Sequence, residues 1–313
     1  MRTKAKRFVK LAADNAFGLS CARFLMLACP LALTACGNGV LEPRGPVGLA
    51  DRTLLIDSLA IMLVIVVPTI VATVAFAWWY RASNKRARYL PDWAYSGRIE
   101  MVVWAIPVMV ILLLGGVAWI GSHLLDPAQP LESKSPALDV EVVSLDWKWL
   151  FIYPKDGVAS VNQLAVPAGV PLHFTLTSSS VMNTFFIPQL GSMIYTMNGM
   201  ATQLYLQADE PGVFRGLSGH YSGEGFSDMH FEMRAVPAQQ FAAWVKTNQS
   251  TEGPTLDAAS YVALARQSSK VPPMAFHSVV PDLFHDIVTL KIAPGPGPRA
   301  DQAAGVQSSA REQ

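Results

Sequence analysis

A group of potential metal ligands lies between residues 220 and 232 of the 313-residue chain. It contains His220, Glu224, Asp228, His230 and Glu232, and imidazole and carboxylate groups are common ligands of divalent metals. The same residue types are common on exposed loops, where they form hydrogen bonds with the backbone and with water. Because no further pattern indicates a metal, we favour surface or loop hydrogen bonding over a mononuclear metal site.

Six methionines near this region could supply thioether ligands for copper. Methionine is also a flexible apolar side chain that fills gaps in hydrophobic cores, and we expect this second role. The six are Met182, Met193, Met197, Met200, Met229 and Met233.

All three cysteines, Cys21, Cys29 and Cys36, lie in or at the end of an N-terminal segment that consists of a basic stretch and a short apolar run at 24–35. Such a run is too short to cross a bilayer and is typical of a secretory signal peptide, which we place at 1–35. The tetrad ending at Cys36 (Leu-Thr-Ala-Cys) resembles the lipobox of bacterial lipoproteins, whose cysteine is acylated; a chance cysteine near an ordinary cleavage site is the alternative. The mature chain then keeps one cysteine and forms no disulfide or thiolate metal site.

Two uncharged segments, 58–80 and 101–122, are each long enough to cross a hydrocarbon core of about 30 Å as a helix. Aromatic residues lie at their ends, as is typical of membrane interfaces; two buried helices of a soluble core are the alternative. The loop 81–100 is basic, and the positive-inside rule places it in the cytoplasm. We therefore expect the N-terminal segment 36–57 and everything after 122 to be periplasmic.

The composition agrees with a membrane protein, because 51% of the residues are hydrophobic and only 15% are charged. Soluble domains carry roughly 25% charged residues. Residues 1–125 have a net charge of +7 and the remainder −6. Neither part has the dense basic surface that nucleic-acid binding requires, so we exclude a nucleic-acid partner.

The exported part begins with short runs rich in Val, Phe, Tyr and Thr, separated by Pro and Gly turns. Over 123–236 this pattern predicts an antiparallel β-sandwich or barrel. Residues 237–291 change to a helical pattern, with helices expected at 239–246 and 256–267. Residues 292–313 are rich in Pro, Gly, Ala and Gln, which predicts a disordered tail.

Three tracts within this framework resemble subunit II of the haem-copper oxidases, in the cytochrome bo-type ubiquinol oxidase branch. They are SLDWKWLFIYP at 144–154, SSSVMNTFFIPQLGSMIYTMNGM at 178–200 and GLSGHYSGEGFSDMHFEM at 216–233. The resemblance extends from about Cys36 to Lys291. It implies a cupredoxin-like fold for 123–236, behind a two-helix transmembrane hairpin, with a short helical C-terminal extension.

In the cytochrome c oxidase branch of this family, the cupredoxin domain carries a binuclear copper centre. Two bridging thiolates join the two ions, and a hydroxyl does not replace them. The resemblance places Asn183 at the upstream His position, Ser218 and Ser222 at the two Cys positions, His220 at the Glu position and Phe226 at the downstream His position; only Met229 keeps its ligand type. We predict no metal and no redox centre in this chain. Quinol dissolves in the membrane and can reach a site inside the bilayer, which removes the need for a copper relay.

Two further features take their interpretation from the resemblance. Glu100 lies at the cytoplasmic edge of the second span. One interpretation is that the helix dipole stabilises its carboxylate. The resemblance implies another, in which Glu100 lies at the entry of a proton channel that leads through a lysine of subunit I. Trp147 and Trp149 match the aromatic segment through which electrons enter the cytochrome c oxidases. Without copper to serve, we expect both to be buried and to contact subunit I.

The sequence thus predicts a non-catalytic, lipid-anchored subunit of a proton-pumping ubiquinol oxidase of the bacterial inner membrane. The resemblance implies that subunit I carries the haems and one copper, that the complex reduces oxygen to water, and that cytochrome c is not a partner. One alternative, subunit II of a cytochrome c oxidase, requires thiolates in 218–222. Another, a stand-alone membrane-tethered cupredoxin-like lipoprotein, has no reason to keep Glu100 or the hairpin.

Overall fold

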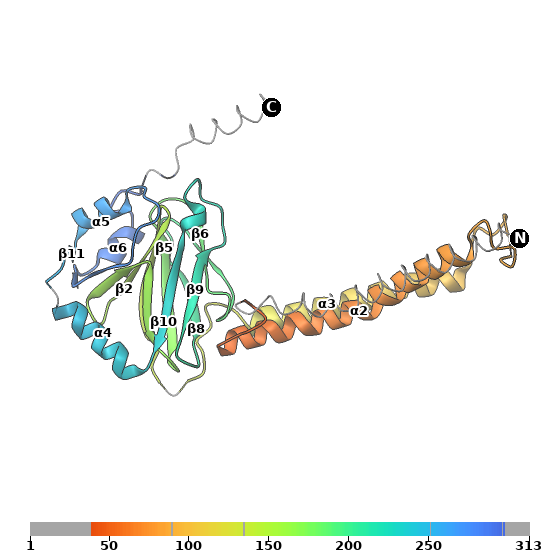
Figure 1. Ribbon diagram of the computed structural model, residues 1–313, viewed down its shortest axis with the longest axis horizontal. Helices are drawn as coiled ribbons and strands as arrows, with labels where there is room; N and C mark the ends of the chain where they lie inside the picture. Colours follow the sequence, from red (N-terminus) through yellow and green to blue (C-terminus); the bar gives the residue numbers. More distant parts are fainter. Residues whose placement is uncertain (1–38, 89, 134, 251, 296, 298–313) are drawn as a thin grey trace, which may run out of the picture.

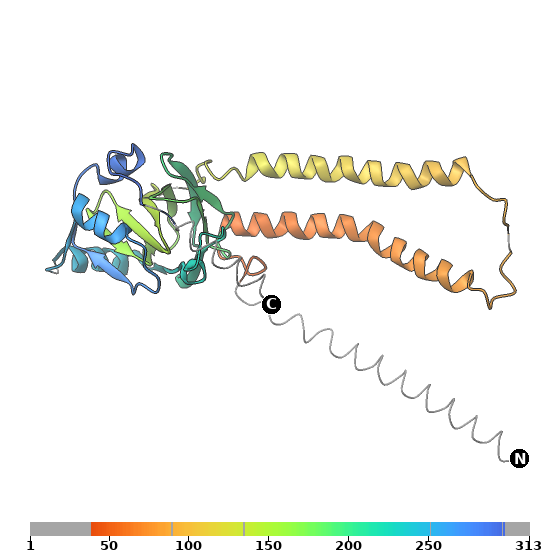
Figure 2. The ribbon, with the colours of Figure 1, turned by 90° about the horizontal axis from the view of Figure 1, so that it is seen from above.

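The computed structural model describes residues 39–88, 90–133, 135–250, 252–295 and 297. The predicted signal peptide and Cys36 lie outside the described residues. Two long helices, α2 (Pro46–Trp79) and α3 (Gly97–Leu124), extend side by side from one end of a β-sandwich (Figure 1). Figure 2 shows the connection between them at the far end of the hairpin.

The two apolar helices have the length and the surface expected of membrane spans. Their most apolar windows have mean hydropathies of 2.7 and 2.5, and no residue of either window is buried inside the chain. A core helix of a soluble protein would be buried, so the alternative of a soluble helical core is wrong. Helices of this length whose apolar side chains are exposed require lipid or a partner protein around them.

Helix α2 begins well before the predicted span. Pro46 occupies its first turn, where a missing N–H group costs no hydrogen bond. The added turns contact the sandwich, because the Gly48 N–H donates to the Leu190 carbonyl at 2.9 Å and Ser192 Oγ donates to Asp51 at 3.0 Å. The first helix therefore continues from the membrane into the exported domain.

The sandwich consists of two mixed sheets. The first has the order β12-β3-β2-β1-β5-β8, formed by Met274–Phe276, Val158–Val161, Lys148–Tyr153, Leu138–Leu145, Pro171–Ser178 and Thr202–Gln207. The second has the order β4-β10-β9-β6-β7, formed by Gln163–Pro167, His230–Val236, Gly212–Ser218, Asn183–Phe186 and Ile194–Thr196. The pairs β1–β5 and β4–β10 are parallel, so the purely antiparallel sandwich predicted from the sequence is wrong. Long crossovers separate the strands of both pairs, which is what parallel pairing requires.

An aromatic core joins the two sheets. Trp149 and Phe151 of β2 lie against Phe185 of β6 and Phe231 of β10, with ring centroids 5.0–6.5 Å apart. All four side chains are at most 1% exposed. Edge-to-face packing of this kind adds to the hydrophobic gain of burying such large side chains.

The C-terminal extension packs α4 against the inner core and covers the outer face of the six-stranded sheet with its later elements. It contains α4 (Ala238–Ser250), β11 (Thr255–Leu256), α5 (Ala258–Ala265), β13 (Ser278–Val279) and α6 (Leu283–Val288), and it adds β12 to the sheet edge. Tyr261, Phe284 and Ile287 form a second hydrophobic cluster with Val143 and Leu150 of the sheet. The first residues after the extension are ordered against the domain, in contrast to the disorder predicted from 292, because the Gly295 N–H donates to the Ser179 carbonyl at 2.7 Å.

Candidate functional site

Four of the six residues at copper-ligand positions come together at one end of the sandwich. Asn183 opens β6 and Ser218 ends the neighbouring strand β9, and Ser218 Oγ donates a hydrogen bond to Asn183 Oδ1 at 3.3 Å. Ser222 Oγ contacts the Met229 sulfur at 3.9 Å. All four side chains are buried. The fold therefore brings together four positions that the resemblance aligns with copper ligands.

Two buried hydroxyls that the sequence analysis did not single out extend this cluster. Ser144 Oγ and Thr196 Oγ1 are 2.8 Å apart, and Asn183 Nδ2 donates to Ser144 Oγ at 3.5 Å. Both hydroxyl residues are completely buried. Ser144 interrupts the inward-facing series of Val140 and Val142 on β1, and this polar residue at an inward position was the available signal. Neutral hydrogen-bonding groups thus occupy the interior of this cluster.

The side chains at the remaining two positions make aromatic contacts, while the His220 carbonyl accepts a hydrogen bond from Ser218 Oγ at 3.3 Å. The His220 ring lies edge-on to Tyr195 with centroids 6.2 Å apart. Phe226 opens the short 3-10 helix η2 (Phe226–Asp228), and its ring lies edge-on to Tyr221 at 5.6 Å. Neither side chain is hydrogen-bonded to Ser218, Ser222 or Asn183 in the part of the chain that the structure describes.

The residues present do not fit a binuclear copper centre. Such a centre needs two bridging thiolates with imidazole nitrogens, whereas the cluster offers hydroxyls, one amide and one thioether that already bond to one another. Among the described residues, no group of three or more His, Cys, Asp and Glu side chains is placed to share a metal ion. His230 and Glu232 lie on the exposed face of β10, and Glu232 pairs with Arg234 at 3.0 Å.

The two tryptophans of the aromatic tract differ in their surroundings. Trp149 is 0% exposed and lies wholly inside the aromatic core, so the prediction that it contacts subunit I is wrong for this residue. Trp147 is only partly buried, and its indole N–H donates to the Ser222 carbonyl at 3.0 Å. It has a positive φ of 67° in the tight connection that separates β1 from β2. The tract 138–153 is therefore a hairpin whose turn directs Trp147 onto the former ligand loop.

The prediction of core packing holds for only some of the methionines. Met229 and Met233 are buried in the inner core, but Met182, Met193 and Met200 are 38%, 53% and 52% exposed. The exposed three lie in the connections around β6 and β7, and no element of the described chain covers them. Their apolar surface is available to a partner.

Glu100 lies in the first turn of α3, three residues after the helix begins at Gly97. Its side chain is exposed and makes no hydrogen bond or ion pair within the described part of the chain. This position favours a carboxylate through the helix dipole and leaves the group open to solvent or to a partner chain.

A buried lysine connects the ligand end of the sandwich to the C-terminal extension. Lys148 is 0% exposed, and its ammonium group donates to the Arg266 carbonyl at 2.8 Å and to Ser268 Oγ at 2.7 Å. Burial lowers the pKa of Lys148 to about 8, against the raising effect of the nearby Asp146 charge. Asp146 is itself buried and accepts a hydrogen bond from Ser180 Oγ. Sequence reasoning did not identify this pair, because lysine is rarely buried.

Two family profiles match the exported part of the chain. Residues 143–236 match the cytochrome c oxidase subunit II periplasmic domain, and residues 251–295 match the COX aromatic-rich motif. The second match coincides with the segment that covers the outer face of the six-stranded sheet.

Curated relatives match over most of their length. The cytochrome bo(3) ubiquinol oxidase subunit 2 of Pseudomonas aeruginosa is 49% identical over 267 residues, which cover 85% of this chain and 80% of the relative. The ubiquinol oxidase subunit 2 of Acetobacter aceti is 50% identical over 270 residues, covering 85% and 87%. A crystal structure of the periplasmic domain of cytochrome oxidase subunit II from Bradyrhizobium japonicum is 24% identical, covers 37% of this chain and 96% of that domain, and gives a TM-score of 0.35. On the identity and coverage of the curated relatives, this chain belongs to the ubiquinol oxidase subunit 2 family of haem-copper oxidase subunits.

Proposed function

We propose that this chain is the non-catalytic subunit II of a proton-pumping ubiquinol oxidase of the bacterial inner membrane. The complex oxidises ubiquinol and reduces oxygen to water, with haems and one copper in subunit I. The observation that carries this proposal is the hydrogen bond between Ser218 and Asn183, because it occupies two former ligand positions with neutral groups. A subunit without a copper relay requires an electron donor that reaches subunit I through the membrane.

The subunit would stabilise subunit I through two surfaces. The hairpin of α2 and α3 exposes apolar side chains along its whole length, and such a surface suits the transmembrane helices of a partner. The exported domain adds an apolar area around β7, formed by Met193, Tyr195, Met200 and Tyr221. This area, together with the partly exposed Trp147, would rest on the periplasmic face of subunit I.

Glu100 would contribute to a proton-entry path on the cytoplasmic side. Its exposed carboxylate stands at the end of a membrane helix, where an ionisable group can accept protons from solvent and pass them to a neighbouring chain. The lysine that receives them would belong to subunit I. In this orientation the basic loop 81–100 would be cytoplasmic and the domain 123–236 periplasmic.

Export and lipidation complete the proposal. Residues 1–35 would be removed as a signal peptide, and Cys36 would carry the acyl chains. Replacing Cys36 by Ser should abolish metabolic palmitate labelling while oxidase activity persists, since two helices already hold the chain in the membrane. Persistent labelling of the variant would refute the lipidation.

Purification of the tagged full chain in mild detergent tests the assembly. We expect a large multispan polypeptide and haem absorption to co-purify with the chain in constant ratio. A chain recovered alone and free of haem, from cells that respire aerobically, would support the stand-alone lipoprotein instead.

A further inference from the structure

A cavity of about 670 Å³ lies between the outer face of the six-stranded sheet and residues of α6. Glu141 of β1 lines the cavity from the sheet, and Asp282 and His285 line it from the α6 side. The Glu141 carboxyl group is largely buried and makes no hydrogen bond or ion pair with any described residue. When it is ionised, Glu141 therefore has no ion-pair partner among the described residues.

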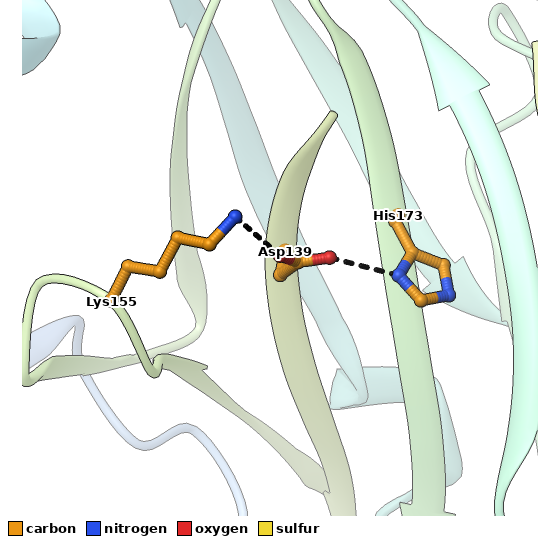
Figure 3. Close-up of polar contacts among 3 residues, drawn as sticks. All are labelled: Asp139, Lys155 and His173. Carbon is orange, nitrogen blue, oxygen red and sulfur yellow. Dashed lines mark hydrogen bonds and ion pairs between the residues drawn. The ribbon is translucent and has the colours of Figure 1, made fainter. Parts of the chain in front are cut away.

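The charged groups around Glu141 are predominantly negative. Asp139 lies two residues earlier on the same face of β1. Its carboxylate forms an ion pair with Lys155 at 2.7 Å and a hydrogen bond with His173 Nδ1 at 2.9 Å (Figure 3). The positive charge of Lys155 is thus engaged elsewhere. The direct strand neighbours of Glu141, Ile152 on β2 and Thr175 on β5, are neutral.

The α6 side of the cavity offers little compensation. Asp282 caps α6 and brings a second carboxylate toward Glu141, whereas Asp286 is paired with Lys291 at 2.7 Å. His285 is the single basic side chain among the residues that line the cavity. Asp156 lies on the sheet side, in the turn between β2 and β3, beside the cavity residues Pro154 and Gly157.

Burial, followed by the charges of Asp139 and Asp282, raises the pKa of Glu141 to about 7. The group is therefore neutral in mildly acidic solution and ionised in mildly alkaline solution. Ionisation places a third carboxylate charge beside Asp139 and Asp282, where solvent screens it only partly.

Helix α6 depends on the sheet for its order. It has only six residues, too few for an isolated helix to be stable. Leu283, Phe284 and Ile287 hold it on the outer hydrophobic cluster. Asp282, at its start, has a positive φ of 62°, a backbone conformation that costs energy outside glycine. A modest electrostatic change beneath this helix is thus sufficient to alter its local stability.

We propose that residues 281–290, the α6 flap, respond to periplasmic pH: the flap packs on the sheet while Glu141 is protonated and opens more often when Glu141 is ionised beside Asp139 and Asp282. The pH that sets the opening of the α6 flap would be the pH on the periplasmic side of the membrane, which receives the pumped protons.

The size of the response follows from linkage. If the carboxyl group regains its ordinary pKa of 4.5 in the open form, the opening constant of the flap rises with pH until Glu141 is ionised in the closed form as well. Between pH 6 and pH 8 the rise is about tenfold. Below pH 7 the slope approaches a factor of ten per pH unit, and above pH 7 it levels off.

Amide hydrogen exchange of the intact detergent-solubilised oxidase measures this directly. Exchange of 281–290 is followed from pH 5.5 to pH 8.5 by mass spectrometry, with correction for the intrinsic pH dependence of exchange. The wild type should lose about tenfold protection between pH 6 and pH 8. In Glu141→Gln the protection should be independent of pH, whereas Glu232→Gln, an exposed carboxylate on β10, should behave like the wild type.

Two results would overturn the proposal: a pH-independent flap in the wild type, or the same pH response in Glu141→Gln. Asp282→Asn provides a second variant that leaves the sheet intact. Removal of the Asp282 charge should weaken the repulsion of ionised Glu141. The pH at which the flap loses protection should therefore be lower in this variant. An unshifted transition in Asp282→Asn would contradict the electrostatic cause.

Discussion

Ser218 Oγ donates a hydrogen bond to Asn183 Oδ1 at 3.3 Å, and this contact joins the end of β9 to the start of β6. Paired strands hold the two residues, since Phe185 lies opposite Ser218 in the β6–β9 ladder. The separation of these two residues is therefore fixed by sheet pairing. Strand pairing thus supplies a backbone frame for the positions that the resemblance aligns with copper ligands.

If that frame is intact, restoring the ligands should restore the metal. The substitutions Asn183→His, Ser218→Cys, His220→Glu, Ser222→Cys and Phe226→His, with Met229 kept, should add two copper ions per complex and intense visible absorption from thiolate bridges. Copper analysis of the unmodified and redesigned complexes, purified in parallel, checks this. A redesigned complex that gains no copper would show that the loop has changed in shape as well as in composition.

Gly225→Ala should destabilise the exported domain. A Cβ atom at this position would lie 2.2 Å from the Trp147 ring, although the φ of −86° is ordinary for alanine. Overpacking of this kind costs about 1–3 kcal/mol. Thermal unfolding of the purified chain in detergent measures the loss, with Gly219→Ala in the same loop as the matched control, because its Cβ would meet nothing closer than 3.6 Å. Equal stability of the two variants would contradict the packing of Trp147 on this loop.

Much of the fold could be predicted from the sequence, because the two membrane spans are strongly apolar and the strands are short runs separated by Pro and Gly turns. The hairpin and the sandwich follow from hydropathy and strand pattern, whereas the loop from Ser218 to Met229 was singled out through the family resemblance. Ser144 and Thr196 could not be placed, since they reach the cluster only through the pairing of distant strands. The parallel pairs and the position of α6 depend on tertiary packing in the same way.

Buried Lys148 should give the domain an unusual alkaline stability profile. Its folded pKa of about 8 lies below the ordinary 10.5, so the unfolded chain binds more protons between these values. Stability relative to Lys148→Met should therefore increase as pH rises from 8 to 10.5, by up to about 3 kcal/mol. Melting temperatures of both forms across this range test the sign. A difference that is constant with pH would mean that Lys148 has the same pKa in the folded and unfolded chains, so that burial does not lower it.

Glu100→Ala should slow quinol oxidase turnover by impeding proton uptake, while Glu100→Asp and Glu100→Gln should have smaller effects. Assembly should be unchanged, because the side chain is exposed and makes no contact within the described residues. Turnover at equal haem content is the measurement. Unchanged turnover of the alanine variant would reduce Glu100 to a residue that stabilises the start of α3 through the helix dipole.

The choice of electron donor tests the central claim most directly. Oxygen consumption by the purified complex is measured with a soluble ubiquinol analogue and, separately, with reduced cytochrome c, at equal enzyme concentration. A subunit II whose ligand positions are occupied by hydrogen-bonded Asn and Ser side chains predicts rapid oxygen consumption with the quinol and none above background with cytochrome c. Sustained oxygen consumption with cytochrome c, and none with the quinol, would contradict the account.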